Sequence, residues 1–241
     1  MDNFLSHACF SVDFELVKFE SSSYFVPSYA RHRPACQAIL RGEYYEPGTH
    51  FLIELLMAET PGNLVHAGTF FGDMLPSFSR KCPKIVYAFE PVLENYVLAK
   101  MCLQENGIGN VALFNSGLGE STEIAYADTR DDSNSLHRGG ASRIAGAGQV
   151  TTITTIDSLA ISELSVIQLD VEGFELPALK GARSTIGRNR PTILIEDNKG
   201  ECEPFLTSLD YVRIGAIPGL EVWCDDRKAA VVKSFVARVN G

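Results

Sequence analysis

The chain has 241 residues, of which 45% are hydrophobic, and it carries a formal net charge of −9 at pH 7. This composition suits a large α/β domain with a full core, and its charge argues against a nucleic-acid partner, because phosphate contacts rely on clustered Lys and Arg. No apolar run is long enough to cross a bilayer, and the acidic start MDNFLSHACF lacks the basic residues of a signal peptide. We therefore expect a cytoplasmic protein without a membrane partner.

The first part of the chain, residues 1–45, predicts an N-terminal extension. Residues 10–20 alternate apolar and polar side chains, which is typical of an edge strand or a hairpin. Residues 31–41 suit a short helix, and residues 50–59 suit another that ends at the TPG stretch.

Short apolar runs then alternate with helical segments. The predicted strands cover residues 63–67, 85–89, 111–115, 165–170 and 191–196. Helices are expected at residues 94–107, from the end of the fourth strand to about residue 186, and at residues 202–209. Residues 211–215 and 220–225 are expected to form a closing antiparallel pair of strands. This alternation predicts an α/β fold with a mostly parallel sheet, whose ligands bind beyond the carboxyl ends of the strands.

Residues 127–148 interrupt this rhythm. A structureless insertion of this length is uncommon within a compact domain, so it is either a lid or binding loop, or a plain surface insertion. Under the first alternative, His137 lies in a loop that closes over a substrate.

The stretch HAGTFFGDM, residues 66–74, follows the first strand of the sheet and holds the first candidate site. Gly68 and Gly72 allow a tight turn and a close approach of backbone to ligand, although the spacing is not the G-x-G-x-x-G of dinucleotide-binding proteins. Glu90 ends the next strand, where an acid commonly bonds ribose hydroxyls. Asn115 and Ser116 follow the third strand, and the small residues there leave room for an adenine ring.

Carboxylates gather after the next two strands. Asp170, Glu172 and Glu175 follow the fourth strand, and Glu196, Asp197 and Asn198 follow the fifth. Acids stabilise a helix N-terminus, but their number also suits a general base that takes a proton from a hydroxyl, or a Mg²⁺ or Ca²⁺ site. The six cysteines form no C-x-x-C pair, so we expect no zinc site, and metal ligands are not assigned.

With these motifs in place, the chain resembles the FkbM-type methyltransferases, which use S-adenosylmethionine. The resemblance runs from about Tyr45 to Asn198 and is carried by LDVEGFELPALKGA, HAGTFFGD, AFEP, SNSL and TTITTIDSL. It implies a Rossmann-like class I methyltransferase fold over residues 46–241, with the insertion at 127–148, and methylation of a hydroxyl group on a sugar, a glycan or another small molecule.

The resemblance also implies roles for individual residues. Those expected to bind the cofactor are His66, Gly68, Thr69, Phe70, Gly72, Asp73, Glu90, Asn115, Ser116 and Asp170. Asp170 and Glu172 are the expected catalytic bases, with His137 as a third candidate.

His66 and Phe70 depart from the family pattern D-V-G-A-N-x-G, in which an acid and an asparagine hold these positions. An acid there would hold the cationic end of the methionine moiety, and a neutral histidine offers no charge. Either the amino group is held elsewhere, or cofactor affinity is unusual. The substitution also gives weight to a catalytically silent cofactor-binding protein. A separate alternative is a nicotinamide oxidoreductase, which shares the sheet and the ribose acid but whose glycine fingerprint is missing.

The last helical segment spaces apolar residues along one face. They are Val231, Val232, Phe235, Val236 and Val239. This face either packs on its own core or forms the contact of a homodimer.

Overall fold

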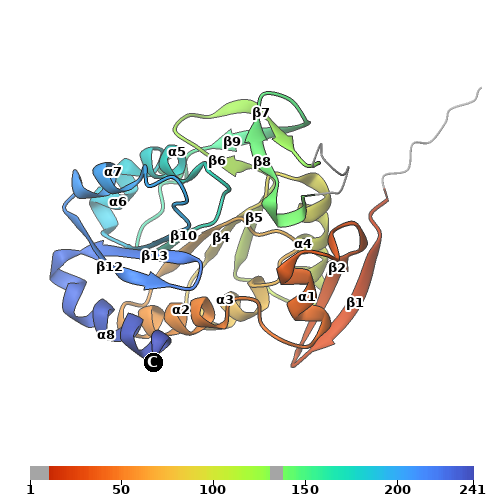
Figure 1. Ribbon diagram of the computed structural model, residues 1–241, viewed down its shortest axis with the longest axis horizontal. Coiled ribbons are helices and arrows are strands. Elements are labelled where there is room, and N and C mark those ends of the chain that lie inside the picture. Colours follow the sequence, from red (N-terminus) through yellow and green to blue (C-terminus); the bar gives the residue numbers. More distant parts are fainter. Residues whose placement is uncertain (1–10, 131–137) are drawn as a thin grey trace, which may run out of the picture.

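The computed structural model describes residues 11–130 and 138–241, and a seven-stranded sheet forms its centre (Figure 1). The strands lie in the order β12-β13-β11-β10-β3-β4-β5, parallel from β11 to β5 and antiparallel at the β11-β13-β12 end. Their bounds are β3 (Asn63–Ala67), β4 (Val86–Phe89), β5 (Val111–Phe114), β10 (Leu164–Leu169), β11 (Thr192–Ile195), β12 (Tyr211–Ile217) and β13 (Leu220–Asp225). The predicted parallel sheet with a closing antiparallel pair is confirmed.

Helices cover both faces of this sheet (Figure 1). One face carries α2 (Pro47–Glu59), α3 (Leu75–Lys81), α4 (Leu93–Glu105) and α8 (Ala229–Asn240), and the other carries α5 (Glu175–Lys180), α6 (Arg183–Asn189) and α7 (Glu203–Thr207). Because both faces are covered, the central strands are continuous apolar runs. No helix in the described ranges has the length and apolar character needed to span a membrane.

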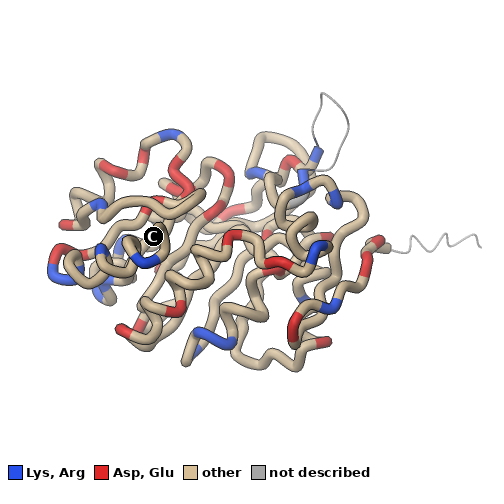
Figure 2. Tube along the Cα trace, turned by 60° about the horizontal axis from the view of Figure 1, so that its bottom comes forward, with Lys and Arg blue, Asp and Glu red and all other residues tan. Residues whose placement is uncertain are grey.

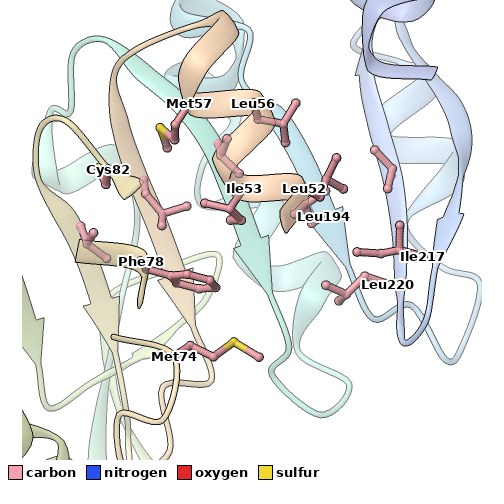
Figure 3. Close-up of a cluster of buried hydrophobic side chains, with 14 of the residues drawn as sticks. Leu52, Ile53, Leu56, Met57, Met74, Phe78, Cys82, Leu194, Ile217 and Leu220 are labelled. Atoms are coloured by element: carbon pink, nitrogen blue, oxygen red, sulfur yellow. The ribbon is translucent and has the colours of Figure 1, made fainter. Parts of the chain in front are cut away.

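The core between α2 and the sheet is shown in Figure 3. Leu52, Ile53, Leu56 and Met57 project from α2 onto strand residues such as Leu194. Neighbouring residues of β3 then alternate between the two cores, with Leu64 on the α2 face and Val65 on the α5 face, as the two-residue period of a strand requires.

The C-terminal helix α8 packs on the same core. Val232, Phe235 and Val236 are buried in the α2 cluster, and Val231 and Val239 pack against it. The apolar face of α8 is therefore occupied within the chain, as the first of the two interpretations expects. A homodimer stays a prediction.

The N-terminal extension contains the predicted hairpin and helix. Strands β1 (Phe14–Phe19) and β2 (Ser22–Pro27) pair in antiparallel fashion, and α1 (Pro34–Leu40) follows. Tyr24 and Val26 of β2 are buried with Leu98 and Cys102 of α4. This contact fixes the extension against the sheet and brings the segment after β2 towards its carboxyl edge.

The prediction of a structureless insertion at residues 127–148 is wrong at both of its ends. A second sheet, in the order β6-β9-β7-β8, is formed by β6 (Gly117–Leu118), β7 (Glu123–Asp128), β8 (Arg143–Ala145) and β9 (Gln149–Thr154). Its strands alternate buried and exposed residues, which gives the sheet an inner face that contains Ala127, Thr151 and Ile153. His137 and the SNSL motif lie outside the described residues.

The single helix predicted after β10 is instead two helices, α5 and α6, separated at Gly181. A Cβ at this position would lie 1.9 Å from the carbonyl oxygen of Gly119. The close approach of a second segment explains both the glycine and the interruption.

Candidate functional site

The candidate site lies at the carboxyl edge of the sheet, where strand order reverses between β3 and β10. Backbone hydrogen bonds continue the ladder one residue past the strands, from Asp170 N to Ala67 O and from Glu196 N to Leu169 O, both 3.1 Å. Glu90 N donates likewise to Phe114 O at 3.1 Å. Glu90, Asp170 and Glu196 are therefore held at the same edge, where ligands of such sheets bind.

The glycine loop after β3 brings backbone very close to β10. Gly68 has a φ of +89°, and a Cβ on it would lie 1.9 Å from the carbonyl oxygen of Asp170. Gly72, with a φ of +84°, instead faces Ala99 of α4, whose Cα would be 3.1 Å from an added Cβ. Gly68 thus shapes the site, whereas Gly72 permits the packing of a helix.

Glu90 is buried and is strongly engaged by the loop. Its Oε2 accepts from Phe70 N at 2.7 Å, and its Oε1 accepts from Val92 N at 2.9 Å and from Asn95 Nδ2 at 3.2 Å. Burial raises the pKa of Glu90 to about 7. A carboxylate offers about four acceptor positions, and these three hydrogen bonds leave one for a ligand rather than the two that a bidentate ribose contact needs.

A first cavity begins at Glu90. The cavity is lined by Ala67, Gly68, Phe89, Glu90, Pro91, Gly117, Leu118, Gly140, Ser142, Ile144, Asp170, Val171 and Phe174. Its walls are mainly apolar, with carboxylates at two points.

Asn115 and Ser116, which were expected beside an adenine, do not line this cavity. Asn115 Nδ2 donates to Glu90 O at 2.9 Å, and Ser116 Oγ donates to Thr152 O at 3.0 Å. Both side chains brace the backbone behind the cavity, and the neighbouring residues Gly117 and Leu118 form its wall.

A second cavity, with a volume of about 150 Å³, adjoins the first and shares Gly68, Gly140 and Asp170 with it. It is lined by Arg33, Pro34, Ala35, Tyr45, Glu46, His66, Gly68, Phe70, Asp73, Met74, Gly140, Gln168, Asp170, Glu172 and Glu196. The sequence did not identify Arg33, Tyr45, Glu46 or Gln168 as site residues. The first three belong to the segment before α2, where no motif marks them.

The carboxylates that follow β10 divide into two groups. Glu175 is buried, and its Oε1 accepts from Val171 N and Gly173 N, both at 3.1 Å, so it holds the loop together. Asp170 and Glu172 instead face the second cavity with Glu196. The sequence left open whether these acids stabilise the start of the helix or face a site. Glu175 has the first role, and Asp170 and Glu172 have the second.

Electrostatics in the second cavity favour protonated acids. Burial, a hydrogen bond with Glu196 and the charge of Glu196 raise the pKa of Asp170 well above its usual range. The pKa of Glu172 is raised by burial and then by Glu196. One oxygen from each of these three side chains lies within 4.8 Å of the others. Such spacing would suit a hard cation with oxygen ligands, so the metal alternative stays a prediction.

His66 and Thr69 are buried in the loop region. His66 Nδ1 donates to Gln168 Oε1, which leaves Nε2 without a hydrogen-bond partner among the described residues, and burial lowers the pKa of His66 to about 4. Thr69 is fully buried and does not line either cavity. Phe70 and Asp73 line the second cavity with His66.

The chain is similar to a known protein family and to solved structures. The family model of the methyltransferase FkbM domain matches residues 66–213. This range includes the glycine loop, Glu90 and the carboxylates after β10 and β11. No curated protein matches the chain.

Two crystal structures of methyltransferases are similar to this chain. Methyltransferase FkbM from Methylobacillus flagellatus KT is 18% identical, with a TM-score of 0.50 over 68% of this chain and 44% of that chain. A methyltransferase from Geobacter sulfurreducens is 13% identical, with a TM-score of 0.48 over 81% of this chain and 87% of that chain. The chain thus spans less than half the length of the first of these proteins. The fold is that of the class I methyltransferases.

Proposed function

Because this chain belongs to the FkbM methyltransferase family, we propose that it methylates a hydroxyl group of a sugar, a glycan or another small molecule, with S-adenosylmethionine as the donor. The observation that carries this proposal is the position of Asp170, which lines both cavities. One carboxylate therefore reaches a cofactor in the first cavity and an acceptor in the second.

The residues of the first cavity fit this cofactor. Gly68 lets the loop pass close to the backbone of Asp170 at the edge of the cavity, and Glu90 retains one acceptor position for a ribose hydroxyl. Leu118, Ile144 and Phe174 supply apolar walls for a flat base. When bound, S-adenosylmethionine supplies a methyl group that its sulfonium has already activated. The protein is then needed mainly for alignment, with reacting atoms about 3–3.5 Å apart.

Asp170 and Glu172 are placed to accept the proton of the acceptor hydroxyl. The raised pKa of Asp170 makes its ionised form a stronger base than an ordinary carboxylate, and proton acceptance by a positioned side chain contributes about 10²–10⁴-fold to a rate. Glu196 lies beside Asp170 and stabilises its orientation through their shared hydrogen bond. Arg33 and Tyr45 bring the N-terminal segment to the same cavity, where it contacts the acceptor.

An acceptor screen that detects the mass gain of one methyl group tests this proposal. With an accepted hydroxyl compound, Asp170→Asn should reduce turnover by about 10²–10⁴-fold, measured at a saturating concentration of S-adenosylmethionine. Glu203→Gln, an exposed acid at the start of α7, is the matched control and should keep full turnover. Unchanged turnover in Asp170→Asn would remove this residue from the mechanism.

A thermal shift assay distinguishes methyl transfer from the other two functions that the sequence suggested. A ligand at 100 times its Kd stabilises a protein by about 2.7 kcal/mol. S-adenosylhomocysteine should therefore raise the melting temperature and NAD should not. A response to the cofactor product without methylation of any acceptor would instead indicate a catalytically silent protein.

A further inference from the structure

We propose that Asp73, together with Glu46, binds the α-ammonium group of the cofactor's methionine moiety. This inference rests on the proposed use of S-adenosylmethionine. It assigns to Asp73 the charge that an acid at position 66 would supply in the family pattern.

His66 supplies no charge to the second cavity, although its side chain is part of the lining. Its Nδ1 carries the proton that is donated to Gln168 Oε1. The other nitrogen, Nε2, is buried without a partner among the described residues, and it is not exposed to the cavity. The charge that an acid at position 66 would supply must therefore come from another residue.

Asp73 supplies the charge. It is 6% exposed and lines the same cavity, and no side chain of the described ranges donates to it or forms an ion pair with it. Burial raises the pKa of Asp73 to about 7, and the neighbouring charge of Glu46 contributes in the same direction. A buried carboxylate without a cation is unfavourable, and a bound cation offsets its desolvation.

Glu46 lines the second cavity together with Asp73 and Asp170, and its charge raises the pKa of both. Its Oε2 accepts from Thr49 Oγ1 at 3.1 Å. Among the residues that line the second cavity, the only Lys or Arg side chain is Arg33, whose charge lowers the pKa of Glu172 rather than that of Asp73. No Lys or Arg side chain among the residues that line the second cavity therefore balances the charge of Asp73.

The two cavities place Asp73 within reach of a cofactor. Gly68 lines both of them, so a ligand whose ribose is held at Glu90 can extend past Gly68 towards Asp73. An ammonium group has three donors, and the carboxylates of Asp73 and Glu46 provide acceptors for them.

The test compares two ligands by isothermal titration calorimetry. S-adenosylhomocysteine carries the amino-acid group, and 5′-methylthioadenosine has the same nucleoside thioether without it. Asp73→Asn should weaken the binding of S-adenosylhomocysteine by roughly ten- to hundredfold, as expected for a hydrogen bond to a charged group. Its affinity for 5′-methylthioadenosine should change less than about twofold.

Two further variants complete the experiment. Glu59→Gln, an exposed acid at the end of α2, changes the net charge equally and should leave both affinities unchanged. Glu46→Gln should weaken S-adenosylhomocysteine selectively, and it tests the same group if Asp73→Asn does not fold.

Asp73→Asn that weakens both ligands equally, or neither of them, would overturn the ammonium site. A wild-type protein that is folded but binds neither ligand would overturn the proposed function itself, and the ammonium site with it.

Discussion

Phe70 has a backbone conformation that costs energy for any residue with a Cβ. Its φ is +49°, in the left-handed region, where the penalty is roughly 1–2 kcal/mol and where Asn is better tolerated. Its ring is 4% exposed and packs against Phe71 and Gly140. At Phe70, backbone strain therefore lowers the stability of the folded protein, whereas burial of the ring raises it.

Burial should prevail at this position. Truncation of a buried Phe costs about 3–5 kcal/mol, more than the strain that Asn would relieve. We predict that Phe70→Asn lowers the free energy of unfolding by about 2 kcal/mol, measured by urea denaturation. A variant as stable as the wild type would show that the backbone strain at Phe70 costs as much as the burial of its ring contributes.

Gly68 is required for a different reason. A Cβ there would combine a strained φ with a collision against the backbone of Asp170, so Gly68→Ala should cost roughly 2–4 kcal/mol and weaken S-adenosylhomocysteine. Gly187, within α6, has no atom within 4 Å of an added Cβ. Gly187→Ala should therefore leave the protein equally stable or raise its stability by about 0.5–1 kcal/mol. Equal losses of stability in the two variants, by thermal denaturation, would contradict this explanation.

The loop between β10 and α5 depends on one buried acid. Glu175 accepts from the backbone of Val171 and Gly173, and the intervening Glu172 has a φ of +53°. Glu175→Ala leaves two N–H donors unpaired, which should cost about 2 kcal/mol and displace Glu172 from the cavity. Glu175→Gln keeps one acceptor oxygen and should lose less.

The control for this loop is Glu203→Gln at the exposed start of α7, which should change stability by less than about 0.5 kcal/mol. Stability is measured by chemical denaturation and site integrity by turnover. Full turnover in Glu175→Ala would show that the loop does not need this acid.

Elements whose structure depends on local pattern were predicted from the sequence. Apolar runs bounded by turn residues identified the strands of the large sheet, because a strand covered on both faces must be apolar throughout. The small sheet was missed in part because β8 has only three residues, Arg143–Ala145, and exists through pairing with β7. The division at Gly181 depends on the approach of Gly119, which no local pattern records.

At the scale of the whole molecule, the sequence predicted the site residues at the strand ends but not those that distant segments bring to the site. Glu90 and Asp170 were predicted because strand ends meet at one edge of a parallel sheet. Arg33 and Glu46 reach that edge because the extension packs on α4 and the segment before α2 lines the second cavity. Lys and Arg are dispersed over the described trace (Figure 2), and the absence of a nucleic-acid partner stays a prediction.

The gathering of buried acids at this edge should make stability depend on pH. The pKa values of Asp73 and Glu90 are raised by burial to about 7, and that of Asp170 is raised as well. A raised pKa in the folded state contributes stability that is present at low pH and lost as pH rises through the folded pKa. His50 and His66, with pKa values lowered by burial to about 4, act in the opposite direction and lose stability below about pH 6.5.

A comparison of Asp73→Asn with the wild type isolates the contribution of one acid from this sum. Between pH 6 and pH 8 the wild type should lose about 1 kcal/mol through Asp73, whereas the variant has no group to ionise there. The difference in free energy of unfolding should therefore move by about 1 kcal/mol in favour of Asp73→Asn as pH rises, measured by urea denaturation without ligand. Glu59→Gln should show no such change, because Glu59 is exposed at the end of α2. A difference between Asp73→Asn and the wild type that stays constant from pH 6 to pH 8 would mean that Asp73 is ionised in the folded protein over this whole range, with its charge compensated without a ligand.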